Sequence, residues 1–345
     1  MKTIESSAAA ESPAGTAERT PGALHRWFCS LRGQQTIVTI VFLTAPLLLF
    51  LVFTCIPFFN MVNFSFYDMN YIGDRVFVGL DNYFEIFTRD DILQSLKLAF
   101  YYLGAAVIQL TLALFFATVL SFRTKFGSLF KGVMFFPFLV CGIAVGFIFK
   151  FFFTQGFVFD TVLSWVGFNK NTLPLWLGNT SINNFSLAGT SIWRYTGQSM
   201  VLFIGAIMSV DPNLYEAAEI DGANGVNKFF HIILPSIKTI VVLNVILSIS
   251  GSISAFEPPY VITGGTFGTA TYFVLMDTIA HANQKVGLAS AMAVILLLII
   301  ILITVIQKLI FRFFLDEDER GMTYPERRKS RKRENAAALA EGGKL

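Results

Sequence analysis

Residues 211–235 read DPNLYEAAEIDGANGVNKFFHIILP and form a polar stretch between two long apolar runs. Asp211 is a favourable N-cap residue, and Pro212 suits the first position of a helix. Gly222 suits the left-handed position that ends a helix, and Asn224 is able to cap a second one. The stretch therefore predicts a short helix, a glycine turn and another helix, which together would make a stiff lever between the two runs.

The rest of the chain is too apolar for a soluble globular domain, a disordered chain or a nucleic-acid-binding domain. Of its 345 residues, 54% are hydrophobic and 14% are charged, whereas a typical soluble protein has roughly 25% charged residues. The mean hydropathy is +0.62. At about 20 apolar residues per membrane span, the excess suits about six spans. We predict an all-α membrane protein with spans at 36–58, 93–120, 133–153, 187–210, 236–256 and 288–311.

The placement of Lys and Arg predicts how these spans are oriented. With the N-terminus in the cytoplasm, 18 Lys and Arg residues fall in cytoplasmic segments and 4 fall in the outer loops, as expected when positive charge is retained inside. Six spans then leave both termini in the cytoplasm. We expect a disordered tail at 1–33, a membrane domain at 34–315 that contains the 211–235 stretch, and a charged tail at 316–345 attracted to lipid.

No catalytic or metal-binding pattern is present in the sequence. The cysteines (Cys29, Cys55 and Cys141) and the histidines (His25, His231 and His281) are scattered along the chain. No phosphate-binding G-x-x-x-x-G-K-[ST] loop occurs, so the chain cannot power itself with ATP. We therefore predict a non-catalytic protein without a metal or cofactor of its own.

Residues 211–235 resemble the full EAA loop of ATP-binding-cassette (ABC) importer permeases, and we call them the coupling loop. The matching positions are Glu216, Ala217, Ala218, Asp221, Gly222, Ala223, Ile232, Leu234 and Pro235. In that family the loop is a coupling helix that docks in a groove on the ATPase subunit. The resemblance implies that Glu216 makes the polar contact in that groove. Ala217 and Ala218 would permit close approach, and Gly222 would make the turn.

Three further segments resemble the carbohydrate-uptake permeases of this family, of the larger maltose-transporter type. Residues 77–83 (FVGLDNY) resemble an F-x-G-L-x-N-Y signature, and residues 287–291 (GLASA) resemble the opening of the last helix. Residues 263–271 resemble a T-x-G-G-P…T loop, although Thr266 stands in place of the usual Pro. The sequence also departs from the pattern where Glu257 and two prolines end the fifth span. The resemblance covers about residues 36–312 and implies the type I ABC importer fold.

The resemblance also implies an assembly in the cytoplasmic membrane of a prokaryote. Its expected partners are a second permease subunit as a heterodimer, two ATPase subunits and an extracytoplasmic sugar-binding protein. The partner ATPase would use ATP and Mg, and this chain would bind no cofactor. Membrane lipid would surround the spans, and no nucleic-acid partner is expected.

Two spans carry polar faces that are candidates to line the path of the substrate. Polar groups that recur at i, i+3, i+4 and i+7 share one face of a helix, and hydroxyl, amide and aromatic groups suit a sugar. The candidates are Ser191, Arg194, Tyr195, Gln198, Asn244, Ser248, Ser252 and Glu257. The serines could instead serve helix packing. Arg194 could pair with Glu257 structurally, or it could contact an anionic substrate.

Other functions explain less of the sequence. A self-powered secondary transporter would be expected to show internal repeats and matching broken spans, and neither is seen. An intramembrane enzyme would need a catalytic constellation that is absent. The sequence leaves the cargo open: an oligosaccharide is the first choice, and glycerol phosphate, another anionic substrate or a small sugar is the alternative.

Overall fold

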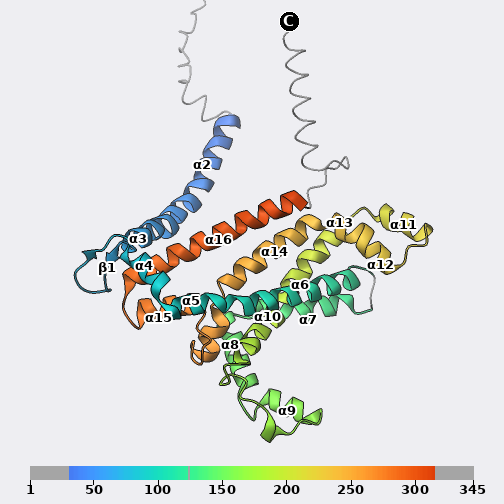
Figure 1. Cartoon of the computed structure of the whole chain (residues 1–345). Helices are drawn as coiled ribbons and strands as arrows, with labels where there is room; N and C mark the ends of the chain where they lie inside the picture. The colour runs from blue at the N-terminus through green and yellow to red at the C-terminus, as the bar shows by residue number, and fades with distance from the viewer. Residues whose placement is uncertain (1–30, 123–124, 315–345) are drawn as a thin grey trace, which may run out of the picture. The chain divides into compact units, whose positions relative to one another are not determined.

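The computed structural model describes residues 31–122 and 125–314, most of which are helical (Figure 1). The predicted tail at 316–345 lies outside the described residues, as does the predicted N-terminal tail up to residue 30. Helix α2 begins at Leu31, so the last residues of the predicted 1–33 tail are helical. The chain divides into two compact units between Asn60 and Met61.

The first unit is an apolar helix. It comprises α2 (Leu31–Phe50), the π-helical turn η1 (Leu51–Cys55) and the start of α3 (Ile56–Phe64). Pro46 lies inside α2, as the sequence predicts. The 27 residues from Val38 to Phe64 contain an 18-residue stretch with a mean hydropathy of 2.5, and together they rise about 40 Å. They are therefore long enough to cross a hydrocarbon core of about 30 Å.

The second unit holds the remaining elements. A short antiparallel hairpin, β1 and β2, precedes the helices. The elements are β1 (Tyr67–Asp68), β2 (Val76–Phe77), α4 (Asp81–Thr88), α5 (Asp90–Lys97), α6 (Ala99–Ser121), α7 (Gly127–Leu139), α8 (Gly142–Phe153), α9 (Val158–Trp165), η2 (Lys170–Thr172), α10 (Asn183–Met208), α11 (Pro212–Ile220), α12 (Gly225–Lys228), η3 (Phe229–Ile233), α13 (Leu234–Ser236), α14 (Lys238–Ile253), η4 (Pro259–Thr263), α15 (Tyr272–His281) and α16 (Val286–Phe314).

Helix α10 lies at the centre of this unit, packed along α6 and α7, while α14 packs on α6. Ala113 and Ala117 of α6 are fully buried against Phe203 of α10, because small residues let two membrane helices approach closely. Gly197 of α10 lies so close to α7 that a Cβ would overlap the backbone carbonyl of Met134.

Three helices of the described residues are long and apolar enough to span a membrane, and up to five spans result if each of two bent helix pairs counts as one. These segments match five of the six predicted spans. The sixth prediction, 187–210, corresponds to α10, which is 26 residues long but carries a polar face. Half of the α10 residues are buried inside the unit, so this helix needs less apolar surface than a span that faces lipid on all sides.

The predicted third span, 133–153, is not one helix. It is broken into α7 and α8, which meet at an angle of 98°. Val140 and Cys141 adopt extended backbone at the break, and the turn brings α8 against η4. Gly146 of α8 lies against Val261 there. This tertiary contact favours the break, which apolar character alone cannot reveal.

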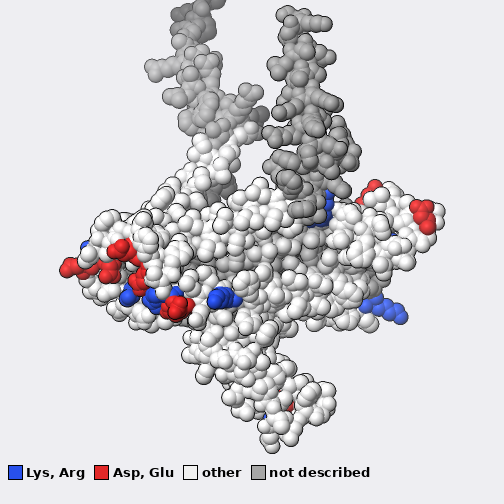
Figure 2. All heavy atoms as spheres, viewed as in Figure 1, with Lys and Arg blue, Asp and Glu red and all other residues white. Residues whose placement is uncertain are grey.

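Charged side chains gather at two ends of the second unit on the face drawn in Figure 2, over α4, α5 and α15 and over α11 and α12, with a broad uncharged surface between them. The exposed residues between the two ends include large apolar side chains such as Phe100, Phe115 and Leu302. An apolar belt bounded by charge is the arrangement expected for a protein surrounded by lipid.

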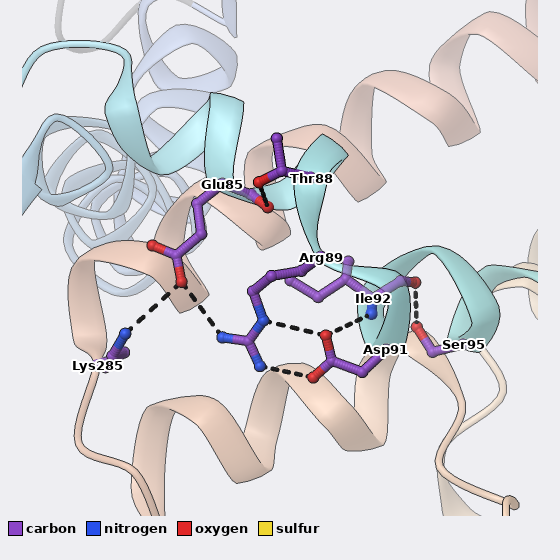
Figure 3. Close-up of polar contacts among 7 residues, drawn as sticks. All are labelled: Glu85, Thr88, Arg89, Asp91, Ile92, Ser95 and Lys285. Carbon is purple, nitrogen blue, oxygen red and sulfur yellow. Dashed lines mark hydrogen bonds and ion pairs between the residues drawn. The ribbon is translucent and has the colours of Figure 1, made fainter.

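An ion-pair cluster fixes the end of the unit that carries α4, α5 and the start of α16 (Figure 3). Arg89 donates two hydrogen bonds to the Asp91 carboxylate, at 3.0 and 2.6 Å, and this bonding raises the pKa of the guanidinium. Arg89 also pairs with Glu85 at 3.3 Å, and Lys285 reaches the same Glu85 oxygen at 3.6 Å. The cluster therefore ties the α4–α5 corner to the segment before α16.

Candidate functional site

A cavity of about 440 Å³ lies among α6, α10, α14 and the residues that follow α14. Its volume falls within the range of small-molecule sites, roughly 300–1,000 Å³. The structure places all the predicted substrate-path residues in its lining: Ser191, Arg194, Tyr195, Gln198, Asn244, Ser248, Ser252 and Glu257. Two polar helix faces predicted separately therefore meet around one space.

The α10 side of the cavity combines polar groups with aromatic rings. Tyr195 lies 6.3 Å from the ring of Phe138, centroid to centroid. The guanidinium carbon of Arg194 lies 5.2 Å from the centre of the Tyr195 ring, within reach of a cation–π interaction. Ser191 and Gln198 complete this face. The arrangement offers hydrogen-bonding groups beside an aromatic surface.

On the α14 side of the cavity, polar side chains form hydrogen bonds to the backbone of their own helix. Asn244 donates to the carbonyl of Ile240 at 3.0 Å, and Ser252 donates to the carbonyl of Ser248 at 2.7 Å. Their donor groups are thus partly used by the helix backbone, which supports the helix-packing interpretation for this pair. Their oxygen atoms can still accept hydrogen bonds, so the α14 face is better suited to accept than to donate.

Two of the lining residues form an ion pair. Arg194 of α10 pairs with Glu257, which follows α14 in the chain. The Arg194 side chain is only 13% exposed, and its Nε is buried without a hydrogen-bond partner among the described residues. A Cβ at Gly142 of α8 would overlap the Glu257 carboxyl group. The small residue at position 142 therefore makes the room in which the pair forms.

Helix α6 supplies two polar lining residues that the sequence analysis missed, Tyr102 and Gln109. Gln109 donates to Ser199 Oγ at 2.8 Å and to the Tyr195 carbonyl at 3.1 Å, so it holds α6 and α10 in register. Tyr102 is 4% exposed, and its hydroxyl has no hydrogen-bond partner within the described part of the chain. The two residues are spaced i, i+7 in an otherwise apolar helix, and this spacing was a usable signal.

Family-signature segments shape the corner that holds Glu257. Thr271 donates to the carbonyl of Ala255 at 2.6 Å, and Gly264 and Gly265 both have positive φ, at 63° and 74°. These values belong to the left-handed region that glycine adopts readily. The segment at 263–271 is therefore a turn that folds back on the chain just before Glu257.

The other two signature segments contact each other. Asn82 donates to the carbonyls of Ser65 and Tyr67, at 2.9 and 3.0 Å. A Cβ at Gly287 would overlap that same Tyr67 carbonyl. Through Asn82 and Gly287, the segments at 77–83 and 287–291 hold the start of α16 against the β1 region.

The coupling loop has the predicted helix, glycine turn and second helix. Asp211 caps α11 by accepting from the Asn213 amide at 2.9 Å, and Asn224 caps α12 by accepting from the Asn227 amide at 2.8 Å. Gly222 has a φ of +75°. The chain then bends by 74° between the helical segments Gly225–Ser236 and Lys238–Ile253, next to Pro235, as predicted.

The motif residues of the coupling loop divide into exposed and inward-facing groups. Glu216, Ala217, Asp221, Gly222 and Pro235 are exposed. Glu216 makes no hydrogen bond or ion pair within the described residues. Ala218 is only 9% exposed, and Leu234 is half-buried. The Ala218 side chain therefore faces its own chain, and its expected part in the close approach of a partner stays a prediction.

The coupling loop is joined rigidly to the helices of the cavity. Ile233 and Ile237 are 1% and 2% exposed and belong to one core cluster with Ile207 of α10. Lys228 and Glu219 pair at 2.7 Å between α12 and α11. Tyr215 donates to the carbonyl of Ile207 at 3.3 Å, and burial raises the pKa of this phenol. Movement of the loop would therefore be passed to α10. No metal-binding cluster occurs among the described residues.

Comparisons with known proteins agree with this architecture. Residues 109–315 match the family described as "Binding-protein-dependent transport system inner membrane component". The chain is 32% identical to the probable ABC transporter permease protein YesP of Bacillus subtilis (strain 168), over 79% of this chain and 90% of YesP. It is 28% identical to the arabinooligosaccharides transport system permease protein AraP of Halalkalibacterium halodurans, over 83% of this chain and 91% of AraP.

The fold is also similar to a solved structure. A chain of a bacterial ABC transporter involved in the import of the acidic polysaccharide alginate superposes with a TM-score of 0.71, at 17% sequence identity, and the match covers 81% of this chain and 97% of that one. At this identity the likeness concerns the fold alone. Taken together with the family match over 109–315, these findings show that the chain belongs to the family of binding-protein-dependent transport system inner membrane components.

Proposed function

We propose that this chain is a transmembrane permease subunit of an ATP-driven, binding-protein-dependent carbohydrate importer, with an oligosaccharide as its cargo. The observation that carries the proposal is the cavity, in which two polar helix faces and aromatic rings enclose about 440 Å³. Hydroxyl-rich molecules with apolar ring faces are matched by such a lining. Relatives whose names include arabinooligosaccharides, diacetylchitobiose and trehalose/maltose support this cargo class.

The proposed topology has six spans with both termini in the cytoplasm, in a prokaryotic cytoplasmic membrane. The three apolar helices and two bent pairs support five crossings. Helix α10 supplies another, shielded from lipid by its neighbours. The excess of Lys and Arg in the segments assigned to the cytoplasm supports the orientation. The coupling loop then lies on the cytoplasmic side, where an ATPase can reach it.

Two features of the chain support the proposed partners: the absence of a phosphate-binding loop from the sequence and the exposure of Glu216. Its sequence has no phosphate-binding loop, so ATP and Mg would be bound by a partner ATPase pair. Glu216 on α11 is exposed and has no partner among the described residues, which supports its role as the polar contact to the ATPase. A second permease subunit would provide the other half of the path, and an extracytoplasmic sugar-binding protein would deliver the cargo.

The proposed mechanism uses the rigid joint between the coupling loop and α10. When the ATPases close on nucleotide, each coupling helix moves with its ATPase. Because Ile233 and Ile237 are packed against Ile207, this displacement shifts α10 and, with it, the lining at Arg194 and Tyr195. Transport is then a shift between inward-open and outward-open populations, driven by contacts that differ between the two states.

The test is transport by the whole complex. The tagged chain is purified with its partner subunits, reconstituted in vesicles with ATP inside and the binding protein outside, and supplied with a mixture of oligosaccharides. We expect ATP-dependent accumulation of oligosaccharide inside the vesicles. Uptake that persists without ATP, or an ATPase that is not stimulated by the loaded binding protein, would contradict the proposed function.

A further inference from the structure

The charges around the cavity cancel. Among the described residues that line it, only Arg194 and Glu257 carry a formal charge, and they pair with each other. The remaining lining is made of neutral polar, aromatic and aliphatic side chains. This chain's side of the cavity therefore presents dipoles and ring faces to a ligand, with no net charge.

The ion pair leaves little opportunity for an anion. The guanidinium of Arg194 is largely buried and already faces a carboxylate. A second carboxylate brought near Arg194 would be repelled by Glu257 and would lose its own hydration without compensation. Glu257 cannot easily turn toward α8 to leave Arg194, because its carboxyl group fills the space beside Gly142.

Neutral hydroxyl groups fit the same lining well. The Tyr102 hydroxyl and the Arg194 Nε are buried polar atoms without partners among the described residues. Such atoms are costly unless a hydrogen bond satisfies them. Both belong to residues that line the cavity. Neither atom has accessible surface of its own, so the groups that can meet a sugar hydroxyl without bringing charge are the partly exposed side chains of Ser191, Tyr195 and Gln198.

From these observations we propose that the cavity selects uncharged oligosaccharides over oligosaccharides that contain uronic acids, and that Glu257 sets this selectivity by neutralising Arg194. The proposal rests on the proposed function, since it names the chemical class of the cargo. Removing the charge of Glu257 without changing the size of its side chain would then leave Arg194 without its counter-charge and admit an acidic sugar.

The first part of the test uses the reconstituted complex described above. Wild-type vesicles receive a mixture of neutral and uronic-acid oligosaccharides, and the sugars that enter with ATP are identified by mass spectrometry. We expect neutral oligosaccharides only. ATP-dependent entry of acidic oligosaccharides would overturn the selectivity proposal while leaving the importer function intact. If no sugar of either class entered with ATP, the proposed function would fail instead.

The second part removes the binding protein, so that only the permease complex discriminates. Thermal unfolding of the purified complex in nanodiscs is titrated with galactotriose and with trigalacturonate, which differ at the C6 carboxylates. Glu257→Gln should bind trigalacturonate at least tenfold more tightly than the wild type does, because a buried cation has lost its partner. Asp74→Asn, an equal change of charge at an exposed site in the β1–β2 turn, should bind it as the wild type does.

A double variant separates charge from shape. Arg194→Gln/Glu257→Gln removes the cation as well, and its affinity for trigalacturonate should return to the wild-type value. The proposal is overturned if Glu257→Gln gains no affinity for the acid, or if the double variant keeps the gain. Should Glu257→Gln fail to assemble, the sugars carried by the wild type decide the matter alone.

Discussion

Replacing Gly222 by Val should uncouple ATP hydrolysis from transport. Gly222 has a φ of +75°, where a β-branched residue costs about 1–2 kcal/mol. A Cβ there meets nothing within 4 Å, so the whole cost is backbone strain in the turn. The turn is held by the bonds from the Gly222 amide to the Glu219 carbonyl, at 3.1 Å, and from the Ala223 amide to the Ala218 carbonyl, at 2.9 Å.

This strain is large enough to lower the fraction of molecules in which the turn has its native conformation. Since about 1.4 kcal/mol is a tenfold change in an equilibrium, the native turn should lose roughly a factor of 5 to 30 relative to alternative conformations. Gly222→Asn should be milder, because Asn tolerates the left-handed region. Gly225→Val is the matched control: Gly225 begins α12 without a positive φ, and a Cβ there also meets nothing within 4 Å.

The assay measures sugar molecules imported per ATP hydrolysed by the reconstituted complex. We expect this ratio to fall most for Gly222→Val, less for Gly222→Asn and not at all for Gly225→Val, while assembly with the ATPase is at least partly retained. Normal coupling in Gly222→Val would refute the role of the turn. Equal uncoupling in Gly225→Val would show that any bulky residue in this loop is harmful and that the backbone conformation is not the cause.

Three other substitutions test separate parts of the structure. Gly197→Val should abolish assembly of the folded chain, because its side chain would overlap the Met134 carbonyl on α7; a monodisperse, active complex in gel filtration would contradict this packing. Tyr102→Phe should leave both the unfolding temperature and the transport rate nearly unchanged, since its hydroxyl is buried and has no partner to lose within the described residues; a severalfold loss of transport would show that this hydroxyl meets the substrate. Lys228→Met should cost less than about 1 kcal/mol in the free energy of unfolding, because its partner Glu219 is 68% exposed, and a larger loss in a denaturation series would contradict that expectation.

Local signals in the sequence predicted the coupling loop well. Asp211, Pro212, Gly222 and Asn224 each have a preference that acts over a few residues, so their positions in the loop followed from chemistry within the segment. The polar faces of α10 and α14 were also predictable, since helical spacing fixes which residues share a face. The structure adds that both faces line the same cavity.

Features that depend on contacts between distant segments were not predictable in the same way. The 98° break between α7 and α8 lies in an uninterrupted apolar run, and it depends on α8 packing against η4. The Arg194–Glu257 pair joins residues 63 positions apart, so the sequence left open whether they pair or contact a substrate. Tyr102 was overlooked because one hydroxyl in an aromatic-rich helix does not stand out without its surroundings.

The proposed role of the coupling loop is to join this chain to an ATPase. It is tested most directly by purifying the tagged chain from solubilised membranes and identifying what comes with it. Glu216→Ala is compared with the wild type and with Glu219→Ala. Both carboxylates are exposed on α11, but Glu219 is paired within the chain and Glu216 is not, among the residues that the structure describes.

We expect the wild type and Glu219→Ala to bring down an ATPase and a second permease in equal amounts. Glu216→Ala should keep the second permease and lose most of the ATPase. A wild-type chain that is recovered alone, stable and monomeric, would contradict the proposed role, as would an ATPase that is retained equally by all three forms.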